Sequence, residues 1–140
     1  MKRILGLDLG TVRIGVAISD PLGFTAQGLE TLPAVPKQKL LDSLKVLCLE
    51  KEVGEVVVGL PVNMNGTMGP KAAEVLEWVK KLEAALEIPV KTWDERLTSR
   101  QADRLMVAEG LSRARQKQES DRLAATLILQ TYLESKRAHS

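Results

Sequence analysis

The sequence predicts a single α/β domain with a mixed β-sheet, and three features of the pattern support that prediction. A β-hairpin pattern opens the chain, strongly apolar strand-like runs follow, and these runs alternate with helical periodicities. Strands and helices in that order form parallel strands joined by right-handed crossovers. The 140 residues match the usual size of one domain. No linker or repeat divides them, so we expect residues 1–140 to fold as one unit.

The first three extended segments predict an antiparallel meander. They are residues 3–9, 14–19 and about 24–32. In the first segment leucines alternate with Gly6 and Asp8, so the leucines share one face of the strand. The turn at 10–13 is short enough to make the second segment the antiparallel partner of the first. A second turn at 20–23 leads into the third segment, which stops at Pro33.

The rest of the chain alternates helices and strands. The expected elements are a helix over about 37–51, a strand over 55–60, a helix over about 70–87, a strand over 88–93, a helix from 98 to near 110, and a helix over about 120–136. Pro70 suits the first turn of its helix. In the last helix we expect an inward face of Leu123, Leu127, Ile128 and Tyr132. Residues 112–120 are polar and basic, which favours a loop.

The composition excludes several classes of function. One cysteine, Cys48, lies on an apolar helical face, and the only histidine is His139, so zinc sites and histidine catalysis are not expected. No apolar run is long enough to span a bilayer, which predicts a soluble, cytoplasmic protein. The net charge of +2 and pI near 8.8 permit nucleic-acid binding without requiring it.

Three acidic residues stand apart from the solvated helical faces that carry most of the others. Asp8 lies inside the first strand, Glu95 follows the strand that contains Trp93, and Asp121 opens the last helix. In α/β sheets, sites gather beyond the carboxyl ends of strands. Converging carboxylates repel one another unless cations lie between them, and Mg²⁺ or Mn²⁺ prefers such oxygen ligands. The pattern therefore predicts a divalent-metal site.

Each of these acids also has a structural explanation that the residues alone leave open. The alternatives are an ion pair of Asp8 with Arg13, an ion pair of Glu95 with Arg96 or Arg100, and a helix cap formed by Asp121. The joint placement of the three acids is more informative than any one of them.

Glycines and basic residues near these acids suggest contacts with phosphate. Gly10 could let a phosphate approach the backbone or could simply be required by the hairpin, and residues 58–66 could form an anion cradle or an ordinary strand-to-helix loop. A local excess of positive charge, which an ordinary solvated face could also explain, would bind phosphates without recognising sequence. It consists of Arg96, Arg100, Arg104, Arg113, Arg115, Lys117 and Arg122.

In combination these motifs closely resemble the YqgF (RuvX) family of RNase H-like proteins, over nearly the whole chain. The motifs are Asp8-x-Gly10-x-x-Arg13-x-Gly15-x-Ala17, Val58-Gly59-Leu60-Pro61 with Asn65-Gly66, Asp94-Glu95-Arg96-Leu97-Thr98, and Asp121-x-x-Ala124-Ala125 with Ile128-Leu129. Each motif alone is weak, whereas the ordered set is highly specific.

The resemblance implies an RNase H-like α/β fold, with a five-stranded mixed sheet whose second strand is antiparallel. It also implies a metal-dependent nuclease site at Asp8, Glu95 and Asp121 that uses Mg²⁺ or Mn²⁺. Members are described as candidate Holliday junction resolvases or as nucleases that mature the 5′ end of pre-16S rRNA, and the rRNA role is the better general assignment. The expected partner is therefore precursor rRNA or branched DNA, bound by a monomer or weak homodimer. Further nucleic-acid contacts are expected from Gly10, Thr11, Arg13, Arg96, Arg113, Arg115 and Lys117.

One departure from the related RuvC resolvases bears on the substrate. Those enzymes bring two acids from the last helix, whereas here Ala124 follows Asp121 by one turn and Gln118 precedes it. Only Glu119 or Asp94 could supply a fourth carboxylate, which weakens the case for junction cleavage. Two further hypotheses are a binding module without activity and a fragment of a sugar-kinase-like ATPase. The ATPase would need a second lobe, for which the chain is too short.

Overall fold

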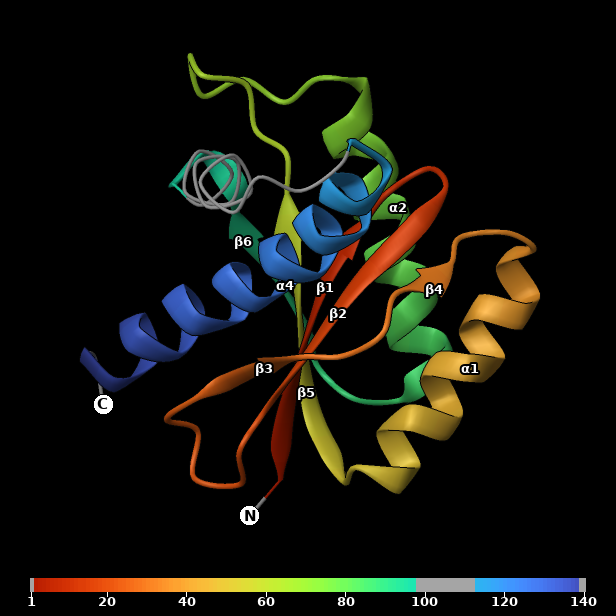
Figure 1. Ribbon diagram of the computed structural model, residues 1–140, viewed down its shortest axis with the longest axis vertical. Helices are drawn as coiled ribbons and strands as arrows, with labels where there is room; N and C mark the ends of the chain where they lie inside the picture. Colours follow the sequence, from red (N-terminus) through yellow and green to blue (C-terminus); the bar gives the residue numbers. More distant parts are fainter. Residues whose placement is uncertain (1, 98–112, 139–140) are drawn as a thin grey trace.

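The computed structural model describes residues 2–97 and 113–138, which form one mixed sheet with helices on both faces (Figure 1). The elements are β1 (Arg3–Leu9), β2 (Arg13–Ser19), β3 (Ala26–Gly28), β4 (Leu32–Pro33), α1 (Lys37–Glu50), β5 (Val53–Leu60), α2 (Pro70–Leu86), β6 (Val90–Asp94), the 3₁₀ turn η1 (Glu95–Leu97) and α4 (Arg113–Ala138). The helix expected over 98–110 lies outside the described residues.

The strand order is β3-β2-β1-β5-β6, and β4 also pairs with β2. β1 runs antiparallel to β2 and parallel to β5, and β5 is parallel to β6. The predicted five-stranded mixed sheet with an antiparallel second strand is therefore confirmed along this path. The predicted third strand was wrong in one respect, because residues 24–32 do not form one strand. After Gly28, Leu29 donates one more bond to Val16, and the chain then pairs with β2 again only at Leu32–Pro33.

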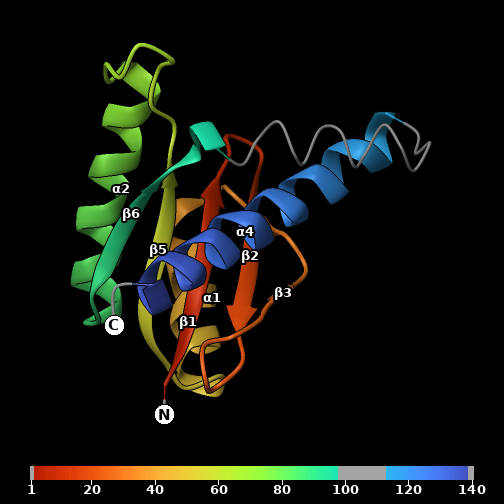
Figure 2. The same cartoon turned by 90° about the vertical axis from the view of Figure 1, so that its left-hand side faces the viewer.

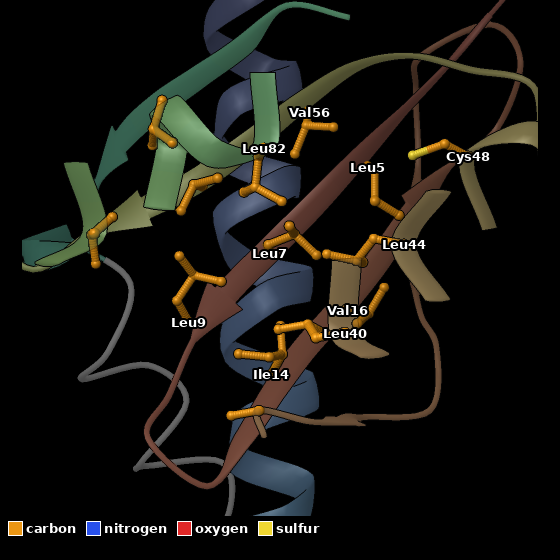
Figure 3. Packing of buried hydrophobic residues seen from close by; sticks show 14 of the residues in the cluster. Leu5, Leu7, Leu9, Ile14, Val16, Leu40, Leu44, Cys48, Val56 and Leu82 are labelled. Carbon is orange, nitrogen blue, oxygen red and sulfur yellow. The ribbon is translucent and has the colours of Figure 1, made fainter. Parts of the chain in front are cut away.

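The alternation in β1 divides the side chains between two cores. The buried Leu5, Leu7 and Leu9 pack with α1 and α2 on one face (Figure 3), while Gly6 faces α4 on the other. Figure 2 shows α4 crossing the sheet on the face opposite α2. The smaller core under α4 contains Ile4, Ala17, Val57, Ala125, Ile128, Leu129 and Leu133. Both faces of the central strands are thus covered, which explains their apolar sequences.

The helical faces follow the predicted spacing with local exceptions. Cys48 is buried as expected, and burial raises the pKa of its thiol to about 11. Leu76 of α2 is apolar but 36% exposed. Leu123 and Leu127 of α4 are only half-buried. The buried face of α4 contains the predicted Ile128 together with Ala125, Leu129 and Leu133, because α4 lies against Gly6 and Gly15 of the sheet on this side.

The predicted loop at 112–120 was wrong over 113–120, where α4 has already begun. This stretch contains arginine, alanine, glutamine, lysine and glutamate, which favour helix, and it has no glycine or proline to stop one. The stretch has no large apolar residues because these first turns of α4 extend beyond the sheet (Figure 2). Among the described residues no helix combines the length and apolarity needed to cross a membrane.

The second half of α4 is held to the sheet by a polar cluster at β5. The Tyr132 hydroxyl donates to the Glu55 carboxylate, and Lys136 Nζ donates to Glu55 Oε1 at 2.7 Å. The Tyr132 ring meets Trp93 of β6 edge-on, with centroids 5.7 Å apart. These contacts fix the direction in which the helix crosses the strands.

Two glycines set the distance between α4 and the sheet. A Cβ added to Gly6 would lie 2.8 Å from Leu129 Cβ and 3.2 Å from the Ala125 carbonyl oxygen. A Cβ added to Gly15 would lie 2.1 Å from the Asp121 carbonyl oxygen, which is backbone and cannot rotate away. The closeness of α4 to β1 and β2 therefore depends on the missing side chains of Gly6 and Gly15.

Gly15→Ala should destabilise the fold, because α4 must move away from β2 to admit the methyl group. We expect a loss of about 1–3 kcal/mol in the free energy of unfolding, as for other overpacked sites. Urea unfolding of both proteins measures it. Gly69→Ala is the matched control, because its added Cβ would meet only Asn63 atoms at 3.4 Å or more and the poorer helix cap costs under about 1 kcal/mol. Equal losses in the two variants would contradict this account of the packing.

Candidate active site

Asp8 lies on the α4 face of the sheet, near the carboxyl end of β1. The alternation that sends Leu7 and Leu9 into the larger core directs Asp8 to the same side as Gly6. Its partner across the antiparallel pair is Gly15 of β2. Asp8 is half-buried, and the missing side chain of Gly15 beside it lets α4 approach the sheet.

Glu95 reaches the same face from the other side of β5. It follows directly after β6 and opens the η1 turn. A Cβ added to Gly59 of β5 would lie 2.8 Å from both Cγ and Oε1 of Glu95, so the Glu95 side chain lies across that glycine. Since β1, β5 and β6 are parallel, their carboxyl ends meet at one edge of the sheet.

The carboxyl groups of Glu95 and Asp8 meet there. Burial, the hydrogen bond to Asp8 and the negative charge of Asp8 together raise the pKa of Glu95 to about 8. Lys71, at the start of α2, opposes this shift. At neutral pH and without a cation, the pair therefore holds a proton that Glu95 donates to Asp8.

Asp121 lies on α4 directly over β2. Its backbone rests against Gly15, the cross-strand partner of Asp8, so Asp121 is one strand away from Asp8 on the same face. Its carboxylate Oδ2 accepts a hydrogen bond from Arg13 Nε at 3.2 Å. Both side chains are about a quarter exposed, at 24% and 26%.

The structure thus brings Asp8 and Glu95 into contact and places Asp121 beside them, paired with Arg13. Among the side chains that the structure describes, in residues 2–96 and 120–138, no three acidic, histidine or cysteine groups lie close enough together to hold one metal ion. Arg13 pairs with Asp121 and not with Asp8, the partner that the sequence suggested. The roles predicted for the three acids remain predictions.

Comparisons with known proteins identify the family of the chain. A family model, RuvX, described as Holliday junction resolvase, matches residues 2–135. The chain belongs to the RuvX family. A relative from Syntrophomonas wolfei is 53% identical over 132 residues, covering 94% of each chain, and one from Clostridium novyi is 50% identical, covering 95% of this chain and 98% of that one. Both carry the name "Putative pre-16S rRNA nuclease".

Solved structures identify the fold. RuvC of T. thermophilus, in complex with a Holliday junction substrate, has a TM-score of 0.60 at 18% identity, covering 98% of this chain and 96% of that one. The fowlpox virus resolvase with Holliday junction DNA has a TM-score of 0.55 at 13% identity, covering 96% of this chain and 98% of that one. The predicted RNase H-like α/β fold is confirmed, and the RuvX chain is a phosphodiester hydrolase of a nuclease family.

The residues of this RuvX chain fit a divalent cation. Two carboxyl groups in contact, one with a raised pKa, offer hard oxygen donors whose mutual repulsion a cation would relieve. Nucleases of the RuvC type depend on divalent metal in general. Asp8 and Glu95 would hold the ion, and Asp121 could join them after leaving Arg13.

Arg96, one of the predicted phosphate contacts, is bound in this structure to Asp94. Its Nη2 is 2.7 Å and its Nε 2.8 Å from Asp94 Oδ2, and its backbone N–H donates to Oδ1. The Arg96 hydrogen bonds lower the pKa of Asp94. Arg96 Nη1 also reaches the Met64 carbonyl oxygen at 3.5 Å, which ties the 61–69 loop to the end of β6. Asp94, considered as a fourth ligand, is therefore paired with Arg96.

The other residues predicted to contact nucleic acid differ in their positions in the structure. Gly10 has a structural role, because its N–H bonds the Arg13 carbonyl oxygen and an added Cβ would lie 2.4 Å from that atom. Thr11 is exposed at the tip of the turn. Arg113, Arg115 and Lys117 lie in the first turns of α4 rather than in the expected loop. Their side chains lie outside the described part of the structure.

Two contributors to the site were missed by sequence reasoning. Gly59 was considered for an anion cradle, but it makes room for the Glu95 side chain and Ile128. Lys71 acts on Glu95 through its charge. The glycine in the apolar strand β5 was the available signal, because glycine there marks a close approach. Nothing in the sequence distinguishes Lys71 from the other lysines of the surface.

Glu95→Gln should remove a pH dependence from the stability of the metal-free protein. The folded pKa of about 8 exceeds the unfolded value near 4.5, so the folded state retains a proton that the unfolded chain releases between those values. Wild-type stability should therefore fall as pH rises through that window, relative to the variant. After allowing for solvent screening we expect a difference on the order of 2 kcal/mol.

Urea unfolding in EDTA at about pH 5 and about pH 9, spanning both pKa values, makes the comparison. Glu77→Gln, at an exposed position on α2, is the matched control and should keep the wild-type profile. Parallel profiles for wild type and Glu95→Gln would show that the carboxyl is not buried beside Asp8.

Proposed function

We propose that this chain is a metal-dependent endonuclease that processes the 5′ end of precursor 16S rRNA. The observation that carries the proposal is the contact between Asp8 and Glu95 at the carboxyl ends of the parallel strands, with Asp121 on the same face. The name carried by relatives that are 50–53% identical supports the RNA substrate. The RuvX fold supports phosphodiester hydrolysis.

Each residue has a distinct part in the proposed reaction. Asp8, Glu95 and Asp121 would ligate Mg²⁺ or Mn²⁺, with Glu95 losing its proton when the ion binds. Bound there, such ions lower the pKa of the attacking water and stabilise the leaving oxygen. The exposed Thr11 and the guanidinium of Arg13 lie at the hairpin turn beside Asp8, in reach of the phosphates that flank the cleaved bond.

The first half of α4 would extend the phosphate contacts along the substrate. Its residues Arg113, Arg115 and Lys117 lie on a helix that projects beyond the sheet (Figure 2), and such contacts hold nucleic acid without recognising sequence. We infer a cytoplasmic protein acting as a monomer or weak homodimer, since one site suffices to cut one RNA strand.

A second candidate function is the resolution of Holliday junctions. The family description and the similarity to RuvC in complex with a Holliday junction substrate favour it. This activity requires two symmetric cuts and therefore a dimer. Against it stands the position one turn after Asp121, where Ala124 offers no second carboxylate from α4.

Asp8→Asn and Asp121→Asn should each abolish metal-dependent cleavage of a precursor 16S rRNA fragment. Loss of a metal ligand should lower the rate by at least about 100-fold, since even outer partners of ligands are worth 10- to 100-fold. Gel assays with Mg²⁺ and with Mn²⁺ measure the cleavage. Asp42→Asn is the matched control, because Asp42 lies on α1, on the opposite side of the sheet, and should retain full activity.

The same assay on a four-way DNA junction separates the two candidate functions. Cleavage of the rRNA fragment without cleavage of the junction supports the proposal, and the reverse result supports resolution. Wild-type activity in Asp8→Asn on the rRNA would overturn the assigned site.

A further inference from the structure

The ion pair between Arg13 and Asp121 involves one of the three acids that the proposed site needs. Arg13 opens β2 and Asp121 belongs to α4, and the two meet because α4 crosses β2 at Gly15. Arg13 Nε lies 3.2 Å from Asp121 Oδ2. One oxygen of the Asp121 carboxylate is therefore already bound to a guanidinium.

The state of the other two acids makes this pairing informative. Asp8 and Glu95 are in contact with each other, whereas Asp121 is in contact with Arg13. Within the described residues these acids do not form a three-ligand group. The third acid of the metal-free site is thus held by an arginine rather than by the other two acids.

We propose that Arg13 is a positioning residue that competes with the metal ion for Asp121. The inference rests on the proposed function, since it takes Asp121 to be a ligand. In the metal-free protein Arg13 holds the Asp121 carboxylate. When a divalent cation takes that carboxylate, the guanidinium is released beside the exposed hairpin turn, where it binds a phosphate of the nucleic acid.

The chemistry of both partners suits such an exchange. A guanidinium binds carboxylate and phosphate with the same planar array of donors, so it can pass from one to the other. Arg13 needs to travel little, because it directly follows the exposed turn residues Thr11 and Val12. Loading of the metal would therefore prepare the site for substrate, and an unloaded site would bind substrate less well.

The exposure of the pair sets its strength. Side chains that are about a quarter exposed form a weak ion pair, and its loss should change metal affinity by about two- to fivefold. A cation can displace so weak a partner. A fully buried pair would resist displacement, and the third ligand would then be lost to the metal.

Three other cationic side chains near the site have contacts of their own. Arg122 Nε, next to Asp121 in α4, donates to the Leu29 carbonyl oxygen at 3.2 Å. Arg96 is bound to Asp94, and Lys71 acts on Glu95. Asp121 is paired with Arg13, which makes Arg13 the residue to test.

A double-mutant cycle on metal binding tests the proposal without relying on nuclease activity. The affinity for Mn²⁺ is measured by calorimetry in wild type, Arg13→Gln, Asp121→Asn and the double variant. Arg13→Gln should tighten Mn²⁺ binding about two- to fivefold. In the Asp121→Asn background the same change should have less than half of that effect, because its target carboxylate is gone.

Lys71→Gln is the matched control, because it also removes a positive charge near the acids but does not act through Asp121. Its effect on Mn²⁺ affinity should be the same in both backgrounds. If Arg13→Gln behaves as this control does, or leaves the affinity of wild type unchanged, the competition is overturned.

The cycle also separates failure of this inference from failure of the proposed function. If wild type binds no Mn²⁺, or if Asp121→Asn binds it as tightly as wild type, the three-acid site itself is refuted. If Asp121→Asn weakens binding and Arg13→Gln has no effect that depends on Asp121, only the role of Arg13 is refuted.

Discussion

The contact between Asp8 and Glu95 is the interaction on which the functional account depends. Two carboxyl groups are expensive to bury together, and the topology holds them there. Asp8 is fixed because the leucines on either side of it are buried in the central strand, so it cannot turn away without losing that packing. Glu95 is fixed by its place directly after β6, across Gly59. A cation at this position would neutralise the two carboxylates more effectively than the proton they share.

The second constraint is the closeness of α4 to the sheet. Glycines at positions 6 and 15 remove the side chains that would otherwise separate the helix from β1 and β2. This approach places Asp121 one strand from Asp8 and within reach of Arg13. The packing of the smaller core and the arrangement of the site therefore have one cause, so a change that displaces α4 should disturb both.

Much of this arrangement follows from the sequence. The alternation in residues 3–9 predicts which face of β1 carries Asp8, and parallel strands ending together predict that Glu95 lies nearby. The ordered motifs predict the family. The pairing of Arg13 with Asp121, rather than with Asp8, depends on where α4 crosses β2. That crossing is set by glycine packing between segments more than 100 residues apart, which local patterns do not encode.

Other differences have equally specific causes. The start of α4 was misjudged because polar residues were taken to indicate a loop, although their helix propensity is high and the helix simply extends past the sheet. Arg96 was expected on phosphate but follows Asp94 at a spacing of two residues, which allows the tight turn that joins them. Gly59 was considered as part of an anion cradle or of an ordinary loop, whereas its position admits the Glu95 side chain.

The most direct test is an NMR titration of the Glu95 side-chain carboxyl in the metal-free protein, compared with Asp8→Asn. The account predicts a midpoint near pH 8 in wild type. It also predicts a midpoint lower by about one unit or more in the variant, because removal of a like charge in contact lowers the pKa of the remaining acid. A wild-type midpoint near the ordinary glutamate value, unchanged by the substitution, would contradict the contact and with it the proposed site.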